Sequence, residues 1–177
     1  MNKKLSILVF TLGFLACNQR DESKVNTNLL YFDINGYFKK ETARLTKTNP
    51  KVIKGVSVNN VKETKVLKIA DWAKEFAIFT NADINKASWN GSFKVEKTNK
   101  TENYTSDDKK IPVKRVVLTQ ENGRIKKLEI VISNKNLLYT SGDTLIYYPD
   151  SLYQIKKHQK IRLLSAKNYE ITGRFKP

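Results

Sequence analysis

The sequence predicts an α+β domain over residues 29–177, in which two helices and a β-hairpin precede an antiparallel, strongly curved meander of about seven strands. Two stretches near its start carry apolar residues at the spacing of an α-helix. The rest alternates apolar and polar residues in short runs, separated by turns rich in Asn, Asp, Gly and Pro. Because no linker or repeat divides this sequence, we expect a single domain.

The first helix is predicted over residues 29–49, where apolar side chains recur at helical spacing opposite charged ones. Asn49-Pro50 ends the run, because the residue before a proline avoids the helical conformation. Residues 52–68 then read as two short strands around Asn59-Asn60, a pair that suits a two-residue turn. A β-hairpin is therefore expected after the first helix.

A second helix is predicted to begin at Asp71, whose short side chain can accept hydrogen bonds from the free N–H groups of a first helical turn. Trp72, Phe76 and Phe79 form its apolar stripe, and the pattern ends near Asn81. The two helices are expected to cover one face of the sheet.

The remaining residues predict strands joined by polar turns. A strand through Trp89, Phe93 and Val95 is followed by a long polar loop over residues 98–110. The later strands are predicted over residues 111–119, 125–132, 137–140, 145–148, 152–156 and 169–175. Turns are expected at Glu121-Asn122-Gly123, Asn134-Lys135-Asn136, Ser141-Gly142-Asp143, Pro149-Asp150-Ser151 and Ala166-Lys167-Asn168.

Residues 1–16 have the organisation of a signal peptide. Two lysines precede an apolar stretch from Leu5 to Ala16, and the one cysteine of the chain, Cys17, follows directly. This stretch would extend roughly 18 Å as a helix, which is too short for a hydrocarbon core of about 30 Å. Phe14-Leu15-Ala16-Cys17 resembles the lipobox of Gram-negative bacterial lipoproteins, although that family usually has Leu where Phe14 stands.

The lipobox resemblance implies that Cys17 is the lipidation site, with a diacylglyceryl group on its sulfur and a further acyl chain such as palmitate on its amino group. The alternative is a secreted protein in which Cys17 is an incidental thiol, but a free thiol is a liability in an oxidising compartment. Each buried CH₂ contributes about 0.8 kcal/mol, so several acyl chains would hold the protein at a membrane permanently.

Residues 17–28 are predicted to be a flexible tether, because they are polar and carry mixed charge after Cys17. Within them, Gln19-Arg20-Asp21-Glu22 resembles the short export signal of some surface-displayed Gram-negative lipoproteins. The resemblance implies a lipid anchor in the outer membrane with the domain on the cell surface. A generic polar linker, with the domain on the periplasmic face, is the alternative.

The chain carries 33 Lys and Arg against 17 Asp and Glu, a formal net charge of +16. Because this charge is spread along the sequence, it favours anionic neighbours without marking one binding patch. The expected partners are the membrane, through the N-terminal lipid, and either an anionic envelope glycolipid or another envelope protein. Nucleic acid is not expected, because export removes the protein from the cytoplasm. The alternative is that lysine only keeps the domain soluble.

The sequence predicts no enzyme, no metal site and no cofactor. Its one histidine, His158, lies among lysines that favour a neutral, solvated ring. Structural zinc needs several Cys or His ligands, which the sequence lacks. Asp107-Asp108 pairs two carboxylates, but Lys109-Lys110 follows at once. Two carboxylates brought together by the sheet, as in glycosidases, stay open as an alternative.

Four aromatic residues on predicted strands are candidate binding residues: Trp89, Tyr139, Tyr147 and Tyr153. Aromatic side chains on a curved sheet can line a cleft for sugar or lipid, although they also form cores. Tyr147 and its neighbour Tyr148 must point to opposite faces of the sheet.

Two short motifs, Asp143-Thr144-Leu145 and Asp150-Ser151-Leu152, resemble the O-glycosylation motif of some exported Gram-negative proteins. They make Thr144 and Ser151 candidate glycosylation sites, with chance occurrence as the alternative.

The segments 136–141 and 145–149 resemble a family of small uncharacterised lipoproteins, and this resemblance implies no activity. The sequence therefore predicts a membrane-anchored binding or assembly module of the cell envelope. A lipid or lipopeptide carrier and a carboxylate-dependent enzyme acting on envelope polymer are the alternatives. The oligomeric state stays open.

Overall fold

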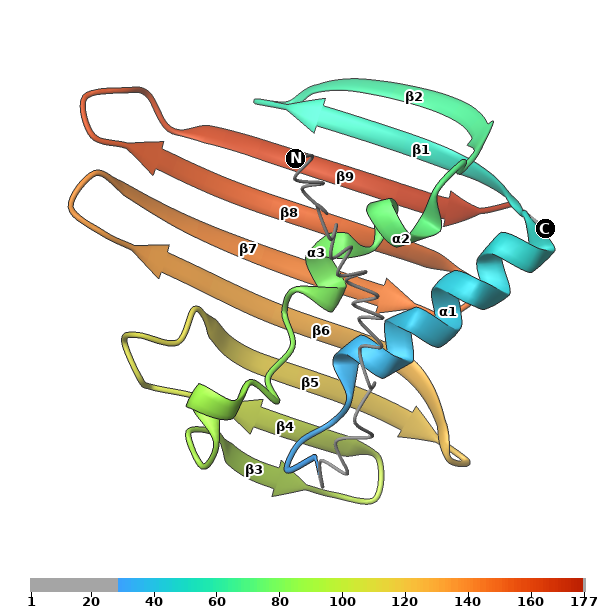
Figure 1. The fold of residues 1–177 in the computed structure, drawn as a ribbon. Coiled ribbons are helices and arrows are strands. Elements are labelled where there is room, and N and C mark those ends of the chain that lie inside the picture. The colour runs from blue at the N-terminus through green and yellow to red at the C-terminus, as the bar shows by residue number, and fades with distance from the viewer. Residues whose placement is uncertain (1–28, 177) are drawn as a thin grey trace, which may run out of the picture.

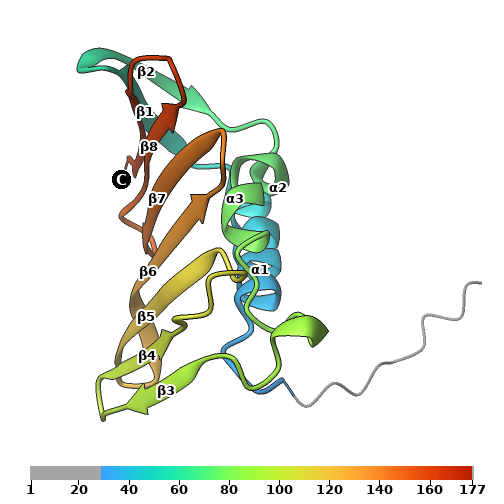
Figure 2. The same cartoon turned by 90° about the vertical axis from the view of Figure 1, so that its left-hand side faces the viewer.

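The computed structural model describes residues 29–176, which form a nine-stranded antiparallel sheet with its helices on one face (Figures 1 and 2). The predicted signal peptide, Cys17 and the export-signal candidates lie outside these residues. The mixed α+β class is confirmed. No helix in the described part of the chain combines the length and the apolar character that a membrane crossing requires.

The elements follow one another in an order that closely matches the predicted one. They are α1 (Ile34–Thr48), β1 (Lys51–Val58), β2 (Val61–Lys68), α2 (Trp72–Glu75), α3 (Ala77–Thr80), the 3-10 turn η1 (Ala87–Trp89), β3 (Lys94–Lys97), β4 (Thr101–Thr105), β5 (Val113–Glu121), β6 (Arg124–Lys135), β7 (Tyr139–Tyr148), β8 (Leu152–Ile161) and β9 (Lys167–Phe175). The strand order across the sheet is β2-β1-β9-β8-β7-β6-β5-β4-β3. The predicted meander is thus present as β3 to β9, and the hairpin extends it because β1 pairs with β9.

The predicted strong curvature of the sheet is wrong. The sheet twists but stays open, with β2 and β3 as its two edges (Figure 2). A sheet must curl only if it has to bury its apolar face against itself. Here α1, α2 and α3 cover that face with large aromatic side chains, so an open sheet is enough.

Both helical predictions need correction at their boundaries. The first helix begins at Ile34 instead of residue 29, because the carboxylate of Asp33 accepts a hydrogen bond of 2.7 Å from the N–H of Gly36 and caps the helix there. Asp71 caps the second helix as predicted, accepting from the N–H of Lys74 at 2.9 Å. That helix is interrupted at Phe76, which leaves α2 and α3 as two short turns.

The turns that depend on left-handed residues are confirmed. Asn59 and Asn60 have φ angles of 47° and 70° and close the β1–β2 hairpin, and Asn122 and Gly123 have φ angles of 50° and 71° between β5 and β6. Both pairs adopt the conformation that two-residue hairpin turns require.

Several strand and turn predictions are wrong. The turns expected at residues 134–136 and 166–168 lie partly inside β6 and β9, and the strand expected over residues 137–140 begins only at Tyr139. The turn expected at Ser141-Gly142-Asp143 lies inside β7, where Ser141 and Asp143 are buried polar residues that interrupt the apolar alternation. The loop expected over residues 98–110 contains β4, whose Tyr104 is its one buried side chain. Trp89 lies in η1 and not on a strand. The predicted strand number is right because the extra turn and the missed strand offset each other.

The core lies between the helices and the central strands. Its largest aromatic residues are Phe38, Trp72, Phe76 and Phe79 from the helices, and Tyr147 and Tyr153 from β7 and β8. The ring centroids of Phe38 and Phe79 are 4.7 Å apart, and those of Phe76 and Tyr153 are 5.4 Å apart. This packing holds α2 and α3 over the middle of the sheet, while β1, β8 and β9 run on beyond them (Figure 1).

Candidate functional site

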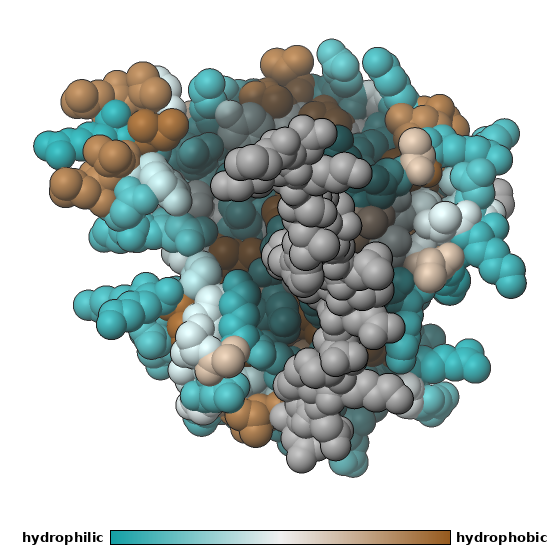
Figure 3. Space-filling model, in the orientation of Figure 1, coloured by the Kyte–Doolittle hydropathy of each residue, from teal (hydrophilic) through white to brown (hydrophobic). Residues whose placement is uncertain are grey.

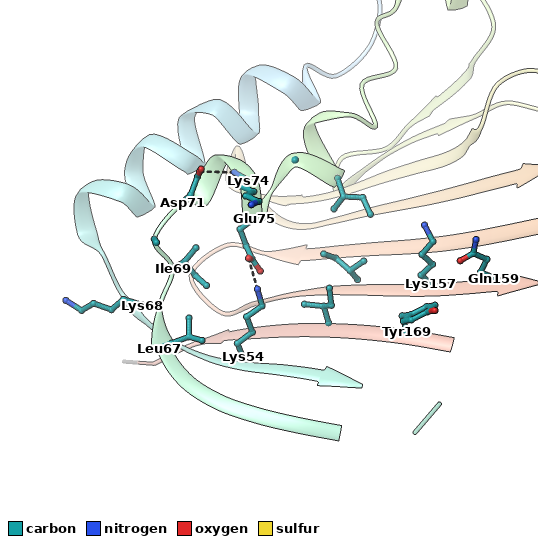
Figure 4. A pocket seen from close by; sticks show the side chains of 15 residues that line it. Lys54, Leu67, Lys68, Ile69, Asp71, Lys74, Glu75, Lys157, Gln159 and Tyr169 are labelled. Atoms are coloured by element: carbon teal, nitrogen blue, oxygen red, sulfur yellow. Dashed lines mark hydrogen bonds and ion pairs between the residues drawn. The ribbon is translucent and has the colours of Figure 1, made fainter. Parts of the chain in front are cut away.

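A groove of about 1050 Å³ lies where the helical layer ends, between α2–α3 and strands β1, β8 and β9 (Figure 4). Its apolar lining consists of Leu67, Ile69, Ala70, Ala77, Ile78, Ile155 and Ile171. The groove is open to solvent. It is therefore a surface site that a ligand could enter without unfolding the helices.

The groove follows from the alternation of β8. Tyr153, Ile155, Lys157 and Gln159 point to the helix side of the sheet, because successive side chains on a strand alternate between faces. Tyr153 is fully buried beneath α2, and Ile155 is 8% exposed at the edge of the helical layer. Lys157 and Gln159 lie farther along the strand and line the groove beyond Ile155 (Figure 4). Along β8, Tyr153 thus belongs to the aromatic core, Ile155 forms the apolar floor of the groove, and Lys157 and Gln159 form its polar mouth.

Cations outnumber carboxylates around the groove. Four lysines and two carboxylates line it. The Nζ of Lys54 pairs with Oε2 of Glu75 at 2.7 Å, and the Nζ of Lys157 lies 3.7 Å from Oδ2 of Asp143. Lys74 has no carboxylate partner within the described residues, and neither does Lys68, which points outward in Figure 4. The groove therefore offers positive charge to a ligand at its mouth.

Neither carboxylate of the groove is arranged for catalysis. Asp71 caps α2, and both oxygens of Glu75 are engaged, one by Lys54 and one by the hydroxyl of Tyr153 at 2.6 Å. A glycosidase needs two carboxyl groups that face each other across a substrate. These two are committed to holding the helix, so the groove is suited to binding.

The structure does not bring the four aromatic candidates together. Tyr147 and Tyr153 lie in the core, where burial raises the pKa of both hydroxyls and each donates a hydrogen bond to a helical glutamate. Tyr139 lies at the start of β7 and is 37% exposed. Trp89 is half-buried beside a separate hollow of about 360 Å³, with the Nζ of Lys86 4.2 Å from its ring centroid.

The two glycosylation candidates occupy different settings. Thr144 is half-buried on β7, on the face away from the helices, because its neighbours Asp143 and Leu145 point toward them. Ser151 is exposed in the turn between β7 and β8. Both remain predictions, and the exposed turn gives Ser151 the better access for an enzyme.

His158 and the Asp107-Asp108 pair serve local structure. The ring Nδ1 of His158 lies 2.7 Å from the Oδ1 of Asn168 across β8 and β9. The carboxylate of Asp108 accepts from the N–H of Lys110 at 2.8 Å. Within residues 29–176 the structure places no three potential ligands of the His, Cys, Asp and Glu types together at one point.

Sequence reasoning missed the residues that form the groove, above all Ile155, Lys157 and Ile171. The change from apolar to charged residues along residues 152–159 was the available signal. It could not be used because nothing local shows where a covering helix ends. No family model, curated protein or solved structure matches the chain. A functional assignment therefore depends on the shape and charge of the groove.

Proposed function

We propose that this domain is a non-enzymatic binding module for an anionic phospholipid, and that a lipid on Cys17 holds it at the outer membrane. The observation that carries the binding proposal is the order of side chains along the groove, from the apolar floor at Ile155 and Ile171 to the lysines at its mouth. The anchor is proposed from the signal-peptide organisation of residues 1–16 and the lipobox resemblance of residues 14–17, and the outer membrane from the export-signal resemblance of residues 19–22.

An acyl chain suits the floor of the groove. The side chains that line it are mainly aliphatic, and each CH₂ that leaves water contributes about 0.8 kcal/mol. The groove is open to solvent, so an acyl chain could enter it without unfolding the helices. This favours a module that binds and exchanges a lipid over one that encloses it.

A phosphate-bearing headgroup suits the mouth. The ammonium group of Lys74 has no carboxylate partner within residues 29–176, and Lys157 is 3.7 Å from its nearest one. Lysine side chains can lay their methylene stems on apolar surface and keep the charge in water beside a phosphate. Because Lys74 has no carboxylate partner within residues 29–176 and Lys157 is only loosely paired with Asp143, an anionic headgroup is favoured over a zwitterionic one.

The test is photo-crosslinking of the full chain in phosphatidylcholine nanodiscs that contain phosphatidylglycerol with a diazirine in its acyl chain. Crosslinked peptides are expected from β8 and β9. The variant Ile171→Asn should reduce this labelling several-fold, because a polar amide replaces part of the floor. Ile146→Asn is the matched control, because Ile146 is equally half-buried but on the opposite face of the sheet.

The charge of the headgroup is tested in the same nanodiscs. Lys74→Gln should weaken labelling by phosphatidylglycerol about two- to fivefold, the effect of one partly solvated charge, and leave labelling by a phosphatidylcholine probe unchanged. Lys40→Gln on α1 is the control, because Lys40 is exposed and lies outside the groove. Equal labelling of Ile171→Asn and Ile146→Asn, or crosslinks that map away from β8 and β9, would refute the proposal.

A further inference from the structure

A cluster of exposed leucines lies at one end of the sheet, in the neighbouring β6–β7 and β8–β9 loops. Leu137 and Leu138 are 82% and 65% exposed, and Leu163 and Leu164 are 97% and 61% exposed. The backbone N–H of Arg162 donates to the carbonyl of Leu138 at 2.8 Å, which joins the two loops. Figure 3 shows hydrophobic residues gathered at this corner of the molecule.

Two further apolar side chains extend the cluster along the strands. Tyr139 and Ile161 are directly paired across β7 and β8, and they are 37% and 40% exposed. Water-soluble proteins rarely expose several large apolar side chains side by side, because such patches attract partners or membranes. We call the six residues the leucine tip: Leu137, Leu138, Tyr139, Ile161, Leu163 and Leu164.

The two sequence segments that contain the leucine tip carry only positive charges. Residues 132–142 and 156–169 contain Lys135, Lys156, Lys157, Lys160, Arg162 and Lys167, and no aspartate or glutamate. Within the described residues, Lys135, Lys160, Arg162 and Lys167 form no ion pair. The tip therefore combines apolar side chains that can leave water with cations that remain beside them.

This combination matches the surface of an anionic bilayer. Leucines in two loop ends can enter the boundary between headgroups and acyl chains, and a tyrosine suits that same depth. Each lysine or arginine near an anionic leaflet strengthens the attraction to it. We propose that the leucine tip inserts into an anionic membrane surface and holds the sheet end-on to it. This inference does not depend on a ligand in the groove.

A protein partner fits the tip less well. A protein partner would have to present an apolar centre within an acidic rim, because basic residues flank these leucines. An uncharged apolar partner would leave those cations without counter-charges. A bilayer of anionic lipids provides apolar depth and negative charge in the same place.

The experiment places an environment-sensitive fluorophore (NBD) on the β8–β9 loop. The full chain carries Cys17→Ser and Ser165→Cys, so that the single thiol lies next to the leucines. On phosphatidylglycerol vesicles we expect a blue shift of the NBD emission and quenching by nitroxide-labelled acyl chains. On phosphatidylcholine vesicles the shift should be at least several-fold smaller, because the cations contribute little there.

Two variants decide which residues carry the insertion. Leu163→Ser with Leu164→Ser should abolish the blue shift, whereas Leu29→Ser with Leu30→Ser should retain it. The second pair is a matched control, because Leu29 and Leu30 are also exposed but lie outside the tip. Replacing Lys160 and Arg162 by Glu should reduce the shift, and Lys62→Glu with Lys65→Glu on the edge strand β2 should not.

Three results would overturn the inference. The first is an unchanged NBD spectrum on phosphatidylglycerol vesicles. The second is an equal blue shift in the variant with Leu163→Ser and Leu164→Ser and in the variant with Leu29→Ser and Leu30→Ser. The third is a dimer that forms without lipid in analytical ultracentrifugation and is lost when Leu163 and Leu164 are replaced by serine. Failure here is separable from failure of the groove proposal, because the groove proposal is tested by acyl-chain crosslinks that depend on Ile171, whereas this inference is tested by NBD emission from the β8–β9 loop.

Discussion

The hydroxyl of Tyr153 on β8 donates a hydrogen bond of 2.6 Å to Oε1 of Glu75 on α2. The second oxygen of Glu75 accepts from the Nζ of Lys54 on β1 at 2.7 Å. A single carboxylate therefore ties a four-residue helix to two strands. So short a helix has little stability of its own, and tertiary contacts must supply it. Since α2 forms one wall of the groove, the Tyr153–Glu75 hydrogen bond helps to keep the groove open.

Removing that hydroxyl should destabilise the domain. Tyr153→Phe leaves Oε1 of the largely buried Glu75 without its donor, and loss of a hydrogen bond to a charged group costs about 1.5–3 kcal/mol. Urea unfolding of the full chain should show this loss in the free energy of unfolding. Tyr139→Phe, at an exposed position, should change it by no more than the error of the measurement. Equal midpoints for the two variants would show that the hydrogen bond contributes nothing.

The contact of Gly173 with Tyr153 leads to a second prediction. A Cβ at Gly173 would lie 2.1 Å from two ring carbons of Tyr153, so Gly173→Ala must push the ring or β9 aside. Overpacking of this kind costs about 1–3 kcal/mol, and the thermal midpoint should fall accordingly. Gly142→Ala on β7 is the control, because a Cβ there meets nothing within 4 Å. Equal thermal midpoints for Gly173→Ala and Gly142→Ala would mean that the ring of Tyr153 can move aside without cost.

The hairpin and the groove show what sequence patterns can and cannot predict. Asn59 and Asn60 encode a left-handed turn through their own conformational preferences, so the β1–β2 hairpin was predictable from local sequence. Strand β4 was missed, because pairing with β3 and β5 holds it and only Tyr104 points into the core. The floor at Ile155 becomes a site only because α2 and α3 stop short of it. That boundary depends on how Phe76 interrupts the helix, a tertiary effect.

The leucines of the tip can be read directly from the sequence, but the sequence does not show that the two pairs lie side by side. Leu137 and Leu163 are separated by two strands, and antiparallel pairing of β7 with β8 brings their loops to the same end of the sheet. The turn wrongly expected at Ser141-Gly142-Asp143 would have broken β7 and placed the β6–β7 loop elsewhere. Only the full length of β7 puts the two leucine pairs side by side.

Asp143 leads to a prediction about pH. Burial raises the pKa of this carboxyl, and the ammonium of Lys157 on β8 opposes that effect only in part. Because the folded pKa lies above the unfolded one, the folded state binds the proton more readily. The free energy of unfolding therefore falls as the pH rises from the unfolded pKa of this carboxyl through its folded pKa, because the buried group becomes ionised. Protonation at lower pH removes that penalty. Stability should therefore depend on pH through Asp143.

The measurement compares Asp143→Asn with the wild type in urea unfolding between acidic and neutral pH. The stability of Asp143→Asn relative to the wild type should be greatest at neutral pH and should decline as the pH falls through the pKa of Asp143. Asp107→Asn, in an exposed loop, should show no such trend. A difference between Asp143→Asn and the wild type that is constant across pH would mean that the carboxyl titrates alike in both states.

The anchor proposed at Cys17 leads to the last prediction. Acylation at Cys17 requires its thiol, so Cys17→Ala should lose metabolic labelling by an alkyne analogue of palmitate, whereas Asn18→Ala should retain it. The fold should be unaffected, because the described core is built from residues 29–176. In fractionated cells the Cys17→Ala protein should be far more readily washed from membranes by high salt, because charge at the leucine tip is screened within about 3 Å at 1 M salt. A wild-type protein without label, or a Cys17→Ala protein as firmly bound to membranes as the wild type, would refute a lipid anchor at Cys17.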